Sequence, residues 1–184
     1  MVLQGWCGYV SLQSKAMRKF VLSIACFTIC SVYAQERSIQ EVYAMMVFNL
    51  TKYVQWPDYA SEGEFVIGVV GNDDIYKTLT EQYGGKQRGK KIYTIKKFRS
   101  VTDLTDCSVI FLDNSKSSEF EALKNKIEGK ETLLITDKNG LGSKGSAINF
   151  KTVESKLKFE LNQKVVENTH LKISNTLLSM AILI

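Results

Sequence analysis

The chain has 184 residues, of which 45% are hydrophobic and 23% are charged, a composition typical of one globular domain with a substantial core. This composition excludes a disordered chain and a coiled coil. The formal net charge is +5, but Lys15, Arg18 and Lys19 lie before or inside an N-terminal apolar segment. The rest of the chain has an excess of about two positive charges, which is too small to form a basic surface that binds nucleic acid.

The N-terminal segment has the features of a secretory signal peptide. A basic start at residues 17–19 is followed by an apolar run over residues 20–32, and the small residue Ala34 precedes a cleavage position before Gln35. We therefore expect cleavage after Ala34 and export to the periplasm. An apolar run of this length is shorter than the roughly 20 residues of a spanning helix, which favours cleavage over an uncleaved anchor.

This segment also sets the expected domain boundaries. Residues 1–34 are expected to be an N-terminal extension plus the signal peptide, with the core signal at 17–34, and residues 35–184 a single α/β domain. Residues 1–16 are expected to come from a misassigned upstream start, with a true extension as the alternative. A lipoprotein cut is disfavoured at both cysteines of this segment. Ile29 is a poor residue before a lipid-modified Cys30, and a cut before Cys26 would leave too short an apolar core.

Cleavage leaves Cys107 as the single cysteine of the mature chain. No intramolecular disulfide is then possible. Cys107 stands at the head of the apolar run 109–112, and we expect a buried, unreactive thiol there.

The first element of the mature domain is predicted to be a helix of about 16 residues. Residues 38–41 have capping-box spacing, and apolar residues recur at helical intervals from Ile39 to Val54. Pro57 is expected to end this helix, because proline donates no backbone hydrogen bond. Trp56 should then lie at the helix exit.

Strands and helices are predicted to alternate through the middle of the chain. Asn72 is expected to cap the first helix of this series, and Gly84 and Gly85 to end it. The predicted strands are 65–70, 92–95, 109–112 and 132–136, and the predicted helices are 73–83 and 117–127.

The pattern changes after residue 146. Two short strands are predicted at 147–150 and 157–161, near a sheet edge, followed by a final helix at 163–183. The fold class that follows is α/β: a three-layer α/β/α sandwich with a mostly parallel central sheet and one or two antiparallel edge strands.

No motif predicts catalysis, a metal site or a cofactor. Residues 140–145 spell G-x-G-x-x-G, but a strand is predicted after them where a dinucleotide site needs a helix, so we expect a glycine-permitted loop. His170 is the only histidine and is expected to be a partly exposed residue of the final helix. The sequence thus predicts a protein that is not an enzyme.

One set of polar residues is a candidate ligand rim. Ligands of open α/β sheets sit beyond the carboxyl ends of parallel strands. The alternative is that these residues only cap the helices that follow them. The candidate rim consists of Asn72, Asp113, Asn114, Asp137 and Lys138.

Several segments taken together resemble the YfiR-like family of periplasmic regulatory (repressor) proteins. The resemblance spans nearly all of the mature chain. It is carried by the exported start and by residues 48–57 (Phe-Asn-Leu-Thr-Lys-Tyr-Val-Gln-Trp-Pro), 67–71, 140–149 and 173–178.

The resemblance implies an α/β sandwich without catalytic residues that holds an inner-membrane diguanylate cyclase inactive from the periplasmic side, with release raising cyclic-di-GMP and promoting biofilm. A membrane sensor kinase is the alternative partner. The lone mature cysteine differs from relatives that use disulfides as redox sensors. As the candidate partner contact we take Lys52, Tyr53 and Trp56; for Trp56 a core position is the alternative.

A second function class remains open, a periplasmic sensor that binds a small ligand at the rim. An enzyme would need a carboxylate site that the spacing does not reveal. A homodimer is left open as well, since exposed patches cannot be read from sequence.

Overall fold

The computed structural model describes residues 38–57 and 61–184, and residues 37–184 form one compact unit. The predicted signal peptide and extension lie outside the described residues. Within the described ranges, no helix combines the length and apolar character needed to cross a bilayer.

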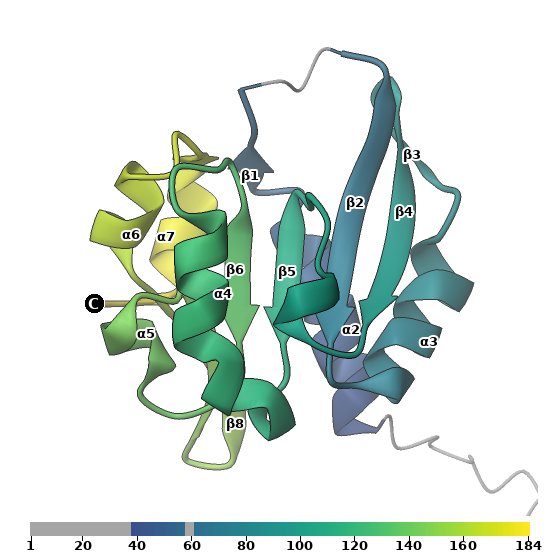
Figure 1. The fold of residues 1–184 in the computed structure, drawn as a ribbon. Coiled ribbons are helices and arrows are strands. Elements are labelled where there is room, and N and C mark those ends of the chain that lie inside the picture. The colour runs from purple at the N-terminus through teal and green to yellow at the C-terminus, as the bar shows by residue number, and fades with distance from the viewer. Residues whose placement is uncertain (1–37, 58–60) are drawn as a thin grey trace, which may run out of the picture. The chain divides into compact units, whose positions relative to one another are not determined.

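The described part of the chain is built on an eight-stranded sheet with the order β10-β8-β7-β6-β5-β2-β4-β3 (Figure 1). Strands β7, β6, β5, β2 and β4 run parallel, whereas β3 and β8 run antiparallel to their neighbours β4 and β7. The strands are β2 (Gly63–Val70), β3 (Gln87–Arg88), β4 (Lys91–Phe98), β5 (Val109–Leu112), β6 (Leu133–Thr136), β7 (Ile148–Val153), β8 (Lys156–Leu161) and β10 (Ile182–Leu183).

Helices cover both faces of this sheet (Figure 1). α2 (Ile39–Leu50) and α3 (Asp73–Tyr83) pack together on one face, and α4 (Phe120–Ile127) lies on the other with the short 3-10 helices η1 (Val101–Asp103) and η2 (Asn114–Glu119). The predicted α/β/α sandwich with a mostly parallel sheet and antiparallel strands towards its edges is therefore confirmed.

The central strand β2 explains why the middle of the sheet has continuous apolar runs. Ile67 and Val69 point into the core shared with α2 and α3, and Val70 points into the core shared with α4. All three are fully buried. Each such side chain contributes about 1.5–3 kcal/mol relative to an exposed position, so a strand buried on both faces selects β-branched residues throughout.

The first predicted helix is too long. Ser38 caps α2 as predicted, but the helix ends at Leu50, where Thr51 donates its hydroxyl to the carbonyl oxygen of Phe48. Residues 54–55 form strand β1 (Val54–Gln55), which pairs antiparallel with β9 (Lys172–Ile173). This pairing with a segment far away in the sequence, rather than Pro57, removes the last turn from the helix.

The predicted final helix at 163–183 is wrong. The segment contains α6 (Gln163–Glu167), β9, α7 (Asn175–Met180) and β10. The side chains of Asn162 and Ser174 each cap a new helix start, which divides the apolar pattern. His170 is exposed in a turn with a φ of 59°, and it does not lie in a helix.

The glycine motif at 140–145 has a structural role. The segment is one turn of helix, α5 (Leu141–Lys144), where a loop was predicted, and Gly140 and Gly145 flank it with φ values of 86° and 119°. A Cβ on Gly142 would lie 2.7 Å from a carboxylate oxygen of Glu160. Gly140 and Gly145 therefore permit left-handed turns, and Gly142 leaves room for the side chain of Glu160.

A buried polar network joins β6 to β8 through the segment after this motif. Asn149 is fully buried, accepts a hydrogen bond of 2.7 Å from the Thr136 hydroxyl and donates one of 3.0 Å to Glu160. The Ser146 hydroxyl is also fully buried and bonds the carbonyl oxygen of Ile148 at 2.7 Å. These contacts give Ser146 and Asn149 a structural function.

Candidate functional site

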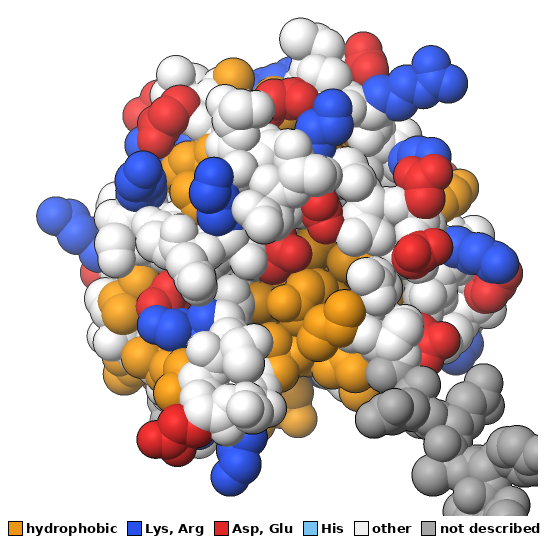
Figure 2. Space-filling model, turned by 90° about the horizontal axis from the view of Figure 1, so that it is seen from below, with side chains coloured by type: hydrophobic (Ala, Val, Ile, Leu, Met, Phe, Trp, Pro, Cys, Tyr) orange, Lys and Arg blue, Asp and Glu red, His pale blue; other side chains and the backbone are white. Residues whose placement is uncertain are grey.

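The structure brings most of the predicted rim together at the carboxyl ends of the parallel strands. Asn72 donates a hydrogen bond of 2.8 Å to Asp113, and Asp137 follows the neighbouring strand β6. Figure 2 shows this end of the molecule, where apolar side chains gather in a hollow bordered by acidic ones.

The same side chains also cap the helical turns that follow. Asn72 accepts from the backbone N–H of Ile75 at the start of α3, and Asp113 accepts from Ser115 at the start of η2. Lys138 bonds the hydroxyl of Ser117 at 2.8 Å, and Asn114 is exposed. Asn72 and Asp113 thus cap the helical turns that follow them, as the alternative interpretation predicts. Ligand binding at the rim remains a proposal.

Asp137 is the most perturbed group of the rim. Burial, followed by the negative charge of Asp113, raises the pKa of Asp137 to about 6, although the backbone N–H groups of Asn114 and Asp137 act in the opposite direction. Its oxygen Oδ1 is buried and has no hydrogen-bond partner within the described residues. The pKa of Tyr43 is also raised, by burial and then by Asp137 and Asp113, which adds α2 to this cluster.

The negative charge of Asp137 is expected to reduce stability near neutral pH. Its folded-state pKa lies above the ordinary value of 3.8, so the folded protein holds the proton more tightly than the unfolded chain. The carboxyl therefore opposes folding increasingly as the pH rises from about 4 to about 6. Asp137→Asn should raise the free energy of unfolding by about 1–2 kcal/mol at roughly pH 7.5, after a discount for solvent screening.

Urea unfolding of both proteins at two pH values checks this. At about pH 4, where the wild-type carboxyl is already protonated, the two free energies of unfolding should agree within roughly 0.5 kcal/mol. A gain of equal size at both pH values would show that packing, and not charge, is the cause.

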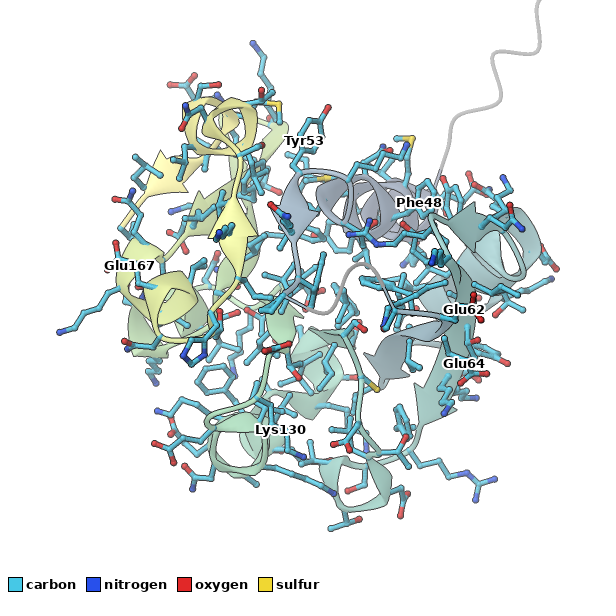
Figure 3. The ribbon with its side chains drawn as sticks, turned by 90° about the horizontal axis from the view of Figure 1, so that it is seen from above. Phe48, Tyr53, Glu62, Glu64, Lys130 and Glu167 are labelled. Atoms are coloured by element: carbon cyan, nitrogen blue, oxygen red, sulfur yellow. The ribbon has the colours of Figure 1, made fainter. Side chains whose placement is uncertain are left out.

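A cavity lies at the opposite end of the sheet, where the parallel strands begin. It has a volume of about 530 Å³. Residues of β2, the β3–β4 hairpin and the loops before β5 and β6 line it, so it is separate from the rim. In the view from above, Glu64 on β2 and Lys130 on the loop after α4 lie on different sides of this opening (Figure 3).

Trp56 forms a wall of this cavity. Its side chain is 6% exposed and packs edge-on against Phe65, with ring centroids 4.7 Å apart. The indole Nε1 donates to the carbonyl oxygens of Glu131, at 3.0 Å, and Ser108, at 3.3 Å. Trp56 therefore joins β1 to the loops that precede β5 and β6, as a core residue and not as an exposed anchor.

The other two residues of the predicted partner contact lie nearer to solvent. Lys52 is exposed, with its ammonium 2.9 Å from Oδ1 of Asn49 and 4.6 Å from the ring centroid of Phe48. Tyr53 is half-buried and lies at the outer edge of the molecule in Figure 3. Its carbonyl oxygen accepts a hydrogen bond from Ser174, which ties this turn to the start of α7.

Cys107 lines the cavity, but its thiol is unreactive. It is buried, as predicted, and burial raises its pKa to about 11. A thiol with this pKa carries little thiolate near neutral pH. Across residues 38–57 and 61–184, no cluster of His, Cys, Asp and Glu side chains is arranged to hold a metal ion.

Sequence reasoning missed the charged residues of the cavity: the basic Arg88, Lys91 and Lys130 and the acidic Glu64, Asp106 and Glu131. Most of them come from a short hairpin and from loops, where no apolar periodicity distinguishes a position that faces a cavity from one that faces solvent. Arg88 is followed at once by a glycine turn and a second strand, but this pattern does not predict a cavity by itself.

The comparison with protein families decides the identity at family level. The sequence model of the YfiR/HmsC-like family matches residues 40–182, which is most of the chain. The chain belongs to the YfiR/HmsC-like family. A search of curated proteins finds no match.

Members of the YfiR/HmsC-like family are periplasmic regulators of cyclic-di-GMP signalling that interact with a membrane signalling protein. The resemblance stated from the sequence is thereby confirmed. The matched range begins inside α2 and ends at β10, so it contains the rim, the cavity, Lys52 and Tyr53.

Proposed function

We propose that this chain is a non-enzymatic periplasmic protein that binds a membrane-bound signalling protein and restrains it. The family match over residues 40–182 supports this proposal most strongly. A diguanylate cyclase is the favoured partner, so loss of the chain should raise cyclic-di-GMP and promote biofilm; a membrane sensor kinase is the alternative.

The partner surface that we propose is the turn between α2 and β1, with Lys52 and Tyr53 as its contacts. Lys52 presents a charge to solvent, and Tyr53 has an aromatic ring of the type that is enriched at binding hot spots. The turn is held in place by the hydrogen bond from Ser174 and, beyond β1, by the buried ring of Trp56. Trp56 thus acts on this surface from beneath.

Capture from solubilised membranes tests the proposal. The tagged chain should retain a membrane signalling protein with a periplasmic domain, identified by mass spectrometry. Lys52→Glu should reduce the retained amount at least about tenfold. A partner surface complementary to Lys52 carries negative charge, and glutamate at this position would repel it. Lys164→Glu on the exposed side of α6 makes the same charge change elsewhere and should leave retention unchanged.

A second candidate function is a periplasmic sensor for a small ligand. The cavity of about 530 Å³ favours it, since this volume lies within the range of roughly 300–1,000 Å³ common for ligand sites. The two functions are compatible in one regulator, where the ligand would change the hold on the partner.

A further inference from the structure

Two aromatic rings are stacked where α2 and α3 end. Phe48 lies near the end of α2, and Tyr83 is the last residue of α3. Their ring centroids are 3.7 Å apart, with an angle of 8° between the ring planes. Both side chains are half-buried, so part of each ring faces solvent. Figure 3 places Phe48 on the same side of the molecule as Tyr53.

Each ring of the stack has a lysine beside it. The ammonium nitrogen of Lys52 lies 4.6 Å from the ring centroid of Phe48, and that of Lys86 lies 5.2 Å from the ring centroid of Tyr83. Rings stacked at 3.7 Å leave no room for an ammonium group between them, so both charges lie outside the pair. We call these four side chains the lysine–aromatic row: Lys52, Phe48, Tyr83 and Lys86.

The exposed part of the lysine–aromatic row is electropositive. An aromatic ring has a negative face and a positive edge. In this row the ring faces are covered by each other and by the ammonium groups, so solvent reaches the ring edges. Two positive edges between two ammonium groups favour negative charge in a binding partner.

The two lysines of the row have no ion-pair partner within residues 38–57 and 61–184. Lys52 donates a hydrogen bond of 2.9 Å to Oδ1 of Asn49, which is uncharged, and Lys86 is exposed. Other lysines of α3 and β4 do have carboxylate partners: Lys77 with Glu81, Lys96 with Glu64, and Lys97 with Asp73. The positive charge of the row is therefore available to a partner.

Strand β4 holds the row in place from beneath. The ring of Phe48 packs against that of Tyr93, with centroids 5.1 Å apart. The backbone N–H of Tyr93 donates to the carbonyl oxygen of Lys86 at 2.9 Å, and the N–H of Gly85 donates to the carbonyl oxygen of Tyr93 at 2.9 Å. The rings and the backbone of Lys86 are thus positioned before binding, which lowers the entropy that a partner must overcome.

We infer that the lysine–aromatic row binds an acidic segment of the membrane partner. Carboxylates of that segment lie at Lys52 and Lys86, and an apolar side chain lies against the ring edges. This inference rests on the proposed function, in which Lys52 contacts the partner, and it extends that surface across α2 to the end of α3.

A structural role of the lysines is the alternative. The C-terminus of a helix has a partial negative charge that favours nearby cations, and Lys52 and Lys86 follow the ends of α2 and α3. Under this alternative, neutralising Lys86 would lower stability and leave binding unchanged. Measurements of both quantities on the same variant separate the two roles.

Fluorescence anisotropy on the purified chain without any partner tests the chemistry of the surface. The probe is a labelled peptide of glutamates with a central phenylalanine, and its match has glutamine in place of every glutamate. We expect the acidic peptide to bind at least about tenfold more tightly than the glutamine peptide, with a difference that shrinks as salt rises. Equal affinity for the two peptides would overturn the proposal.

Lys86→Glu should weaken binding of the acidic peptide at least about tenfold, and Lys86→Gln should weaken it by a smaller factor without changing the urea midpoint. Lys164→Glu on α6 makes the same charge change away from the row and should keep the wild-type affinity. The proposal is wrong if Lys164→Glu weakens binding equally, if Lys86→Gln lowers only stability, or if the chain prefers phosphatidylglycerol vesicles to the peptide.

Capture from membranes distinguishes this inference from the proposed function. Lys86→Glu should lose the membrane signalling protein that the wild-type chain retains, as Lys52→Glu does. Wild-type retention by Lys86→Glu would contradict the extension of the surface to α3 and leave the proposed function intact. Retention of no such protein by the wild-type chain would contradict the proposed function itself, whatever the peptides show.

Discussion

Trp56→Ala is expected to lower the free energy of unfolding by about 3–5 kcal/mol, the range for removal of a large buried aromatic ring. The ring is 6% exposed, packs on Phe65 and donates to two loop carbonyl oxygens, so alanine would leave both a void and unpaired acceptors. A loss of this size is expected if the Trp56 side chain connects β1 to the loops before β5 and β6.

Urea unfolding at constant pH measures it, and Trp56→Phe is the control. Phenylalanine retains a ring against Phe65 but has no N–H group, and the loss should be about 1–2 kcal/mol. A loss below roughly 1 kcal/mol for Trp56→Ala would contradict the buried position of the ring. It would restore Trp56 as a candidate surface contact.

Asn149→Ala is expected to lower the free energy of unfolding by about 2–3 kcal/mol, because it removes a buried side chain together with one hydrogen bond to the Thr136 hydroxyl and one to the carboxylate of Glu160. Among the described residues, Thr136 then keeps only Ser146, and Glu160 only Lys151, as a side-chain partner. Thr152→Ala, at an exposed position of the same strand, is the control and should change stability by no more than about 0.5 kcal/mol. Thermal unfolding followed by circular dichroism measures both.

The state of Glu160 gives a second measure of the same network. Burial acts to raise the pKa of Glu160, but hydrogen bonds from Lys151 and Asn149 outweigh it and the pKa is lowered. Asn149→Ala removes one of these donors and should shift the pKa upward in an NMR titration. An unchanged pKa together with full stability would show that Asn149 does not support the carboxylate.

Residues buried on both faces of the sheet were predictable from sequence. The strand at 109–112 was predicted with the bounds that the structure has. A run of four apolar residues between polar neighbours is too short for a buried helix and is typical of a strand that is buried on both faces. The cap at Asn72 and the helix end at Gly84 were also correct, since both depend on local backbone chemistry.

The errors lie where distant segments decide the local structure. Val54 continues the apolar spacing of α2, but it pairs with Ile173 near the other end of the chain, and neither segment shows this by itself. The predicted final helix failed for the related reason that two capping side chains and the β9 pairing divide one apolar pattern into four elements. Periodicity alone does not resolve such short elements.

The candidate sites were predictable to different degrees. The rim followed from a topological rule, and the structure places Asn72 next to Asp113, as a shared edge requires. The cavity lies at the end of the sheet where that rule predicts no ligand. The positions of Arg88 and Lys91 in its lining depend on how a two-residue strand pairs with β4, which the sequence does not specify.

Capture of membrane proteins on the tagged chain tests most directly whether this family member binds a membrane-bound signalling protein. The account predicts that the wild-type chain and Lys164→Glu retain the same signalling protein with a periplasmic domain, and that Lys52→Glu loses it. Retention of no membrane signalling protein by a folded wild-type chain, at low and at physiological salt, would contradict the account.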